Sequence, residues 1–159
     1  MTVAVVVARD GRLPVGTIEV CGEAAGDVIV VGHGAEEALR SLPGVTRGRW
    51  AETGPGFHPG ALAAALAEVV TGHRLVLLPA SPDGRDLAPR LAAATGRPLL
   101  ARALEARVHG DGVTVTLARL DDQVLVPVEV RGPAVVTLAV GGRHLPHAGA
   151  PDASPGAPI

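Results

Sequence analysis

Aromatic side chains are almost absent from this chain of 159 residues. They make up 1% of the sequence, as Trp50 and Phe57, and tyrosine is missing. A core without aromatic rings has to be built from valine, leucine and alanine, which suits short buried strands under small helix faces. Proteins that bind single-stranded nucleic acid stack bases on aromatic rings, so the shortage argues against that class.

Lysine is absent as well, and there is one cysteine, Cys21. The 14 basic residues are all arginines spread along the chain, and the net charge is −2, so no basic patch for nucleic acid is visible. Without lysine there is no P-loop. A single cysteine excludes an intrachain disulfide and a cysteine-rich zinc site, and its simplest interpretation is a small buried hydrophobe.

Long apolar segments are missing too. The apolar run near the N-terminus, residues 3–8, is far too short to span a bilayer, and no basic leader precedes it. We therefore expect no membrane insertion and a soluble, cytoplasmic protein.

What the sequence has instead is an alternation of strands and helices over its first hundred residues. Segment 14–25 fits helical spacing, although residues 17–20 would also suit a strand; we favour a helix because parallel strands need a crossover. The predicted strands are 3–8, 27–31, a stretch within 45–51 and a run from residue 75, and the other predicted helices are 35–42, a helix from 59 closed by Gly72, and one after residue 85.

After residue 98 the pattern changes to β structure. Residues 113–117 and 124–130 alternate, and Pro127 marks the second run as an edge strand or bulge. Residues 134–140 predict a final buried strand. We predict an α/β fold of three layers, with a mostly parallel sheet, helices on both faces and an antiparallel β extension in the second half. Residues 1–140 form one domain, and residues 141–159, rich in glycine, proline and alanine, are expected to be a disordered tail.

Two short motifs have competing interpretations. Gly32-His33-Gly34 follows a strand, but Glu37 replaces the third glycine of a dinucleotide fingerprint. We favour a tight helix start; the alternative is an anion on the free N–H groups of residues 35–37. His144 and His147 have metal-pair spacing but lie in the tail, where a solvated segment is favoured. We find no catalytic constellation and expect no metal site.

The segment 75–96 carries the strongest signal. An apolar strand leads through a polar turn into a helix, which places Arg85 and Asp86 at the carboxyl end of a buried strand, where ligands and partner chains meet open α/β sheets. Pro89 lacks an N–H and is tolerated in a first turn, so we predict a helix that begins near Asp86 with its carboxylate as the cap. Arg85 is either a solvated residue beside a capped helix or a contact with a partner subunit.

The run 79–96, PASPDGRDLAPRLAAATG, resembles the amino-terminal domain of electron transfer flavoprotein alpha subunits. The order of the flanking elements agrees over residues 1–140. The resemblance implies an adenine-nucleotide-hydrolase-like version of the fold, and a short form of this kind also resembles bacterial paralogues associated with the mycofactocin redox system. The matching positions are Gly84, Arg85, Asp86, Leu87, Ala88, Pro89, Arg90, Leu91, Ala92 and Ala93.

The resemblance also implies a role. Alpha subunits of that family continue into a domain that holds most of the FAD contacts, and this chain stops at Ile159, where that domain would begin. We therefore expect a scaffold subunit that pairs with a beta-type subunit in an electron-carrying complex between a dehydrogenase and an acceptor. FAD is expected only in that complex and AMP on the partner subunit, and we expect this chain to catalyse no bond chemistry. The implied partner contacts are Gly84, Arg85, Asp86 and Arg90.

The alternative is a stand-alone adenine-nucleotide-binding or regulatory module of the same fold. Such a module would hold its nucleotide at the carboxyl ends of the strands. Its weakness is the missing glycine-rich phosphate loop.

Overall fold

The centre of the molecule is a set of strands that are apolar along almost their whole length. In the computed structural model, which describes residues 1–119, 124–141 and 157–158, these strands are β1 (Thr2–Ala8), β2 (Asp27–Gly32), β4 (Leu75–Pro79) and β8 (Ala134–Leu138). Nearly all of their side chains are buried. Uninterrupted apolar runs of this kind belong to strands that are covered on both faces.

One sheet contains all the strands of the described residues, in the order β7-β6-β5-β8-β4-β1-β2-β3-β9. Pairing is parallel from β5 through β8 to β9, whereas β5, β6 and β7 pair antiparallel. The predicted mostly parallel sheet with an antiparallel extension is therefore confirmed. The remaining strands are β3 (Arg47–Glu52), β5 (Leu99–His109), β6 (Gly112–Arg119), β7 (Val124–Arg131) and β9 (Ala157–Pro158).

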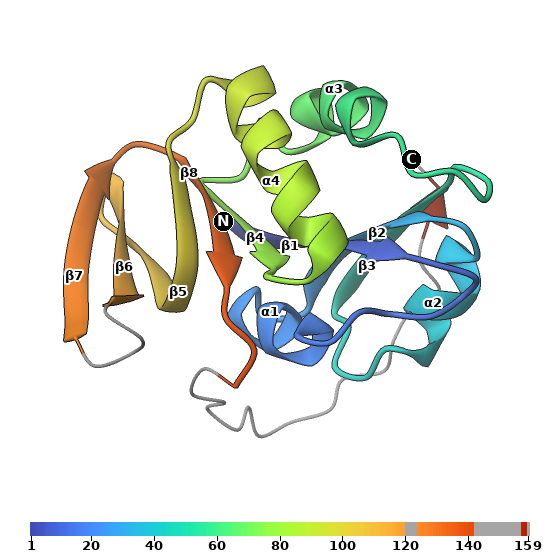
Figure 1. Cartoon of the computed structure of the whole chain (residues 1–159), viewed down its shortest axis with the longest axis horizontal. Helices are drawn as coiled ribbons and strands as arrows, with labels where there is room; N and C mark the ends of the chain where they lie inside the picture. The colour runs from blue at the N-terminus through green and yellow to red at the C-terminus, as the bar shows by residue number, and fades with distance from the viewer. Residues whose placement is uncertain (120–123, 142–156, 159) are drawn as a thin grey trace.

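Helices cover both faces of the parallel part, which confirms the three layers (Figure 1). Helices α1 (Thr17–Glu23) and α2 (Ala35–Ser41) pack on one face, and α3 (Pro59–Val69) and α4 (Pro82–Thr95) pack on the other. Each face has its own cluster of valine, leucine and alanine side chains. The helix at 14–25 is confirmed in the shorter form of α1.

Helix α4 begins four residues earlier than predicted. Ser81 is the cap, because its Oγ accepts a hydrogen bond from the Gly84 amide at 3.2 Å, and Pro82 occupies the first position. Pro89 therefore lies inside the helix and removes the donor that would pair with the Arg85 carbonyl. Both residues lie on the exposed face, where water can bind that carbonyl. The prediction of Asp86 as the cap was wrong, because Ser81 caps the helix.

Strand β5 has no counterpart in the prediction. It begins parallel to β8, shifts register after Leu100 and then continues antiparallel to β6. Arg102 sits at this shift with a positive φ of 59°, and its amide donates to the Thr137 Oγ1 at 3.0 Å. The irregular path explains why the segment has no simple alternation.

The ends of the sheet were predicted in part. Strand β7, which contains Pro127, is an edge strand as predicted. Ala157 and Pro158 pair with β3, which differs from the disorder expected for the tail at these two residues. The rest of the tail, 142–156 and 159, lies outside the described residues.

Candidate functional site

The carboxyl ends of the parallel strands carry a charged cluster at the point where the strand order reverses. Strand β1 lies between β4 and β2, so the chain leaves it to one side and later returns on the other. Arg9 follows β1, Asp83 lies in the first turn of α4, and Phe57 precedes α3. In open α/β sheets this is the crevice that usually takes a ligand.

These three side chains contact one another directly. The Arg9 Nε and Nη2 donate to the two Asp83 carboxylate oxygens at 2.8 and 2.9 Å. The Arg9 Cζ lies 4.7 Å from the centroid of the Phe57 ring. The hydrogen bond from the guanidinium to Asp83 raises the pKa of Arg9, against the opposing effect of desolvation. We call this arrangement the Arg9–Asp83–Phe57 clasp.

A second carboxylate occupies the start of α2. The Glu52 oxygens accept hydrogen bonds from the amides of Gly34 and Ala35 at 3.0 and 3.1 Å. The Glu52 Oε1 also lies 3.2 Å from the His33 Nδ1. Desolvation alone would raise the pKa of Glu52, but these amide and imidazole contacts outweigh it and the pKa is lowered. Asp10 lies on the other side of the ring, with its Oδ1 3.7 Å from the His33 Nε2.

The Glu52 contacts bear on the two interpretations of Gly32-His33-Gly34. Two of the N–H groups at the helix start, those of Gly34 and Ala35, already bind a carboxylate of the chain itself. Gly34 has a φ of 70°, and a Cβ there would lie 2.3 Å from the Gly11 amide nitrogen. The motif forms a tight helix start, as favoured, and of the three amides in the anion alternative the Ala35 amide already binds Glu52.

The four residues implied as partner contacts divide into one buried and three exposed positions. Arg85, Asp86 and Arg90 are exposed on α4, and the Arg90 guanidinium donates to the Asp86 carbonyl. Gly84 is buried under the same turn, and a Cβ at this position would lie 2.0 Å from the Pro79 carbonyl oxygen. Gly84 thus lets α4 pack close to β4. Because it is buried, it can affect a partner only by setting the position of α4. A role of these residues in partner binding stays a prediction.

A polar cluster of the buried His73 and the half-buried Asp27 and Arg49 lies at the opposite, amino edge of the sheet. The Asp27 Oδ1 accepts from the Arg49 Nη2 at 3.0 Å, and its Oδ2 lies 3.5 Å from the His73 Nε2. Burial lowers the pKa of His73, and the positive charge of Arg49 adds to this, while Asp27 opposes it. Sequence analysis missed this cluster. The available signal was a charged residue at the first position of an otherwise apolar strand.

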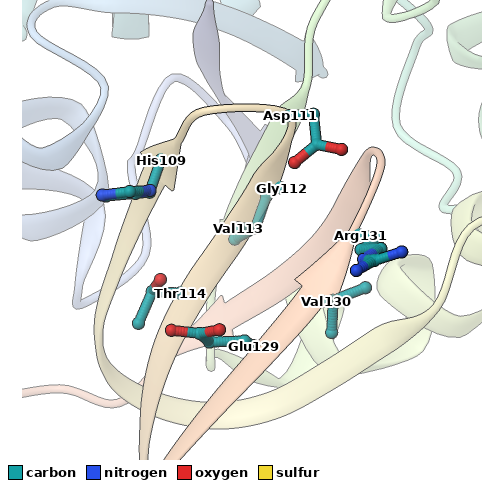
Figure 2. Close-up of a pocket in the computed structure, with 8 residues that line it drawn as sticks. All are labelled: His109, Asp111, Gly112, Val113, Thr114, Glu129, Val130 and Arg131. Carbon is teal, nitrogen blue, oxygen red and sulfur yellow. The ribbon is translucent and has the colours of Figure 1, made fainter.

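The antiparallel extension bears an open hollow of about 410 Å³ near the turn between β5 and β6. Figure 2 shows His109, Asp111, Glu129 and Arg131 spread around it. Gly112 lies between them and carries no side chain that would fill the space. A metal ion or an acid–base pair requires side chains that converge on one point. The polar side chains here surround the hollow and do not converge.

Other candidate ligands have simple structural surroundings. Cys21 is buried, and burial raises the pKa of its thiol, as expected of a small core residue. Within residues 1–119 and 124–141, no three histidine, cysteine or acidic side chains are placed to hold a metal ion. His144 and His147 lie outside the described residues.

The comparison with family models identifies the chain. The model of the electron transfer flavoprotein domain matches residues 19–152, which is most of the sequence. The chain belongs to this family. The match agrees with the resemblance to alpha-subunit amino-terminal domains. No curated protein matches the chain.

Two further observations concern the β7 edge and the helices. Strand β7, at the edge of the sheet, exposes the apolar side chains of Val124, Leu125 and Val126 at 41%, 59% and 37%. Among the described residues, no helix is long and apolar enough to cross a membrane.

Proposed function

We propose that this chain is an alpha-type scaffold subunit of an electron transfer flavoprotein. In this role it pairs with a beta-type subunit, and the complex carries electrons from a dehydrogenase to an acceptor. The observation that carries the proposal is the family match over residues 19–152 in a chain whose charged side chains at the strand ends bind one another and a helix start. The expected place of the complex is the cytoplasm.

The crevice argues for a scaffold more than for a nucleotide module. A nucleotide phosphate at the strand ends would bind free N–H groups at a helix start. At α2 the Glu52 carboxylate binds the amides of Gly34 and Ala35. At α4 the Ser81 hydroxyl binds the Gly84 amide, and Asp83 in the first turn pairs with Arg9. A phosphate that binds the amides of Gly34, Ala35 or Gly84 would have to displace these contacts.

Two surfaces are candidate interfaces with a second polypeptide. The exposed face of α4 presents Arg85, Asp86 and Arg90, whose charges can set the orientation of a partner. The β7 edge presents backbone groups and apolar side chains, which suit pairing with a strand of another chain. In the complex we expect FAD to be held largely by other segments and AMP by the partner, so the chain itself does no bond chemistry.

Co-expression with a beta-type subunit of the same genome tests the proposal. A heterodimer that copurifies with flavin absorbance is the expected result, and the chain purified alone should be colourless. A chain that stays monomeric and without pigment contradicts the scaffold role. Calorimetry with AMP and ATP on the isolated chain tests the alternative, because micromolar binding would favour a nucleotide module.

Arg85→Ala is the matching test of the α4 face. We expect it to weaken the heterodimer about tenfold, which corresponds to about 1.4 kcal/mol, while the melting temperature of the isolated chain stays within about 2 °C. Arg40→Ala is the control, because Arg40 is an exposed arginine on α2, on the other face of the sheet. If Arg85→Ala lowers the melting temperature of the isolated chain by as much free energy as it takes from the heterodimer, the role of Arg85 is purely structural.

A further inference from the structure

The Arg9–Asp83–Phe57 clasp joins three segments that are far apart in the sequence. Arg9 comes from the end of β1, Phe57 from the loop between β3 and α3, and Asp83 from the first turn of α4. The guanidinium is held on two sides, by the two Asp83 oxygens along its edge and by the Phe57 ring against its face. A bidentate pair of this kind restricts direction more than a single contact does.

The clasp acts on the part of α4 that carries the exposed charges. Asp83 precedes Arg85 by two residues and Asp86 by three, so they share the first two turns of the helix. Below this turn, Gly84 lets the helix approach the Pro79 carbonyl, and Ser81 caps it. Ser81 and Gly84 determine how closely the helix start packs on β4, and the clasp connects the helix start to the end of β1.

We infer that Arg9 and Asp83 are positioning residues for partner binding, because the clasp holds the start of α4 at the angle at which Arg85 and Asp86 meet the partner subunit. The inference rests on the proposed function and names how its docking face is preorganised. Preorganised contacts bind more tightly because less ordering is left to the binding step.

The exposure of the pair separates this role from a role in stability. The side chains of Arg9 and Asp83 are 46% and 22% exposed, and ion pairs in such surroundings contribute little to folding. A loss of the clasp should therefore change the affinity for the partner more than the melting temperature. Lysine at position 9 keeps the charge but has neither the planar fork nor the stacking face.

The experiment compares Arg9→Met, Arg9→Lys, Asp83→Asn and the double variant Arg9→Met/Asp83→Asn in the heterodimer with the beta-type subunit. We expect each to weaken the complex about tenfold, with the double variant no weaker than the single ones because both changes remove the same pair. The melting temperature of each isolated chain should stay within about 2 °C. Glu36→Gln is the control, since it breaks the exposed Glu36–Arg40 pair on α2.

Amide NMR shifts of Arg85 and Asp86 supply a readout that a purely energetic role would not move. They should change in Arg9→Met and Arg9→Lys, where the substituted residue lies on another element, and stay unchanged in Glu36→Gln. If the wild-type chain forms no complex, the proposed function fails and this inference fails with it. If the wild type binds and Asp83→Asn binds equally well, or Arg9→Lys retains full affinity, the positioning role alone is wrong.

Discussion

The amino and carboxyl edges of the parallel sheet both carry an arginine–carboxylate pair and a histidine, but in different surroundings. At the amino edge, Arg49 and Asp27 are 19% and 15% exposed and lie beside the buried His73. At the carboxyl edge, Arg9 is 46% exposed and His33 is 45% exposed. We therefore expect the loss of one partner to cost more folding free energy at the amino edge than at the more exposed carboxyl edge.

The largest expected effect is the loss of the carboxylate at the amino edge. Asp27→Ala leaves the half-buried Arg49 without its anion and removes the carboxylate beside the buried His73, so we expect the free energy of unfolding to fall by about 3 kcal/mol in urea denaturation. Asp86→Ala removes an exposed carboxylate near the carboxyl edge and should change it by less than about 0.5 kcal/mol. Equal losses in the two variants would remove the distinction between the edges.

A slightly smaller effect is expected at a buried position of the carboxyl edge. Gly84→Ala places a Cβ against the Pro79 carbonyl oxygen and should cost about 2 kcal/mol of unfolding free energy. Gly60→Ala is the matched control in α3, because no neighbouring atom lies within 4 Å of a Cβ there. It should stabilise the protein by up to about 1 kcal/mol. A neutral Gly84→Ala would mean that α4 can move away from β4.

The pH dependence of stability sharpens the comparison. Burial lowers the pKa of His73 in the folded chain below its ordinary value of 6.5, so acid protonates the unfolded chain first. The contribution of His73 is complete above pH 6.5 and is lost as the pH falls below that value. Thermal melts at pH 7.5 and 5.5 should show this decline, and His73→Gln should flatten it. An unchanged slope in His73→Gln would assign the decline to other groups.

The smallest effect is expected at the cap of α2. Glu52→Gln weakens the contacts to the amides of Gly34 and Ala35, which should cost about 0.5–1 kcal/mol at neutral pH. The lowered pKa of Glu52 means that this contribution is complete above its ordinary pKa of 4.5 and is lost as the pH falls further. The difference in melting temperature between wild type and variant should therefore shrink as the pH falls below 4.5. A constant difference would show that charge has no part in the cap.

Much of the fold could be predicted, because burial leaves a regular trace in the sequence. The runs that became β1, β2, β4 and β8 are apolar at almost every position, since helices cover both of their faces. Pro127 correctly marked β7 as an edge strand. The candidate site was found only in part. Arg85, Asp86 and Arg90 are exposed on α4, but the Arg9–Asp83–Phe57 clasp depends on contacts between residues up to 74 positions apart.

The order of the elements, the three layers and the edge strand thus follow from local apolar patterns, which hydrophobic burial imposes residue by residue. The start of α4 does not, because both Ser81 and Asp86 can cap a helix, and Ser81 is selected where Gly84 meets Pro79 and Asp83 meets Arg9. The path of β5 likewise depends on a hydroxyl of Thr137, 35 residues away. Close packing between distant segments decided these features, and no pattern within one segment records such a contact.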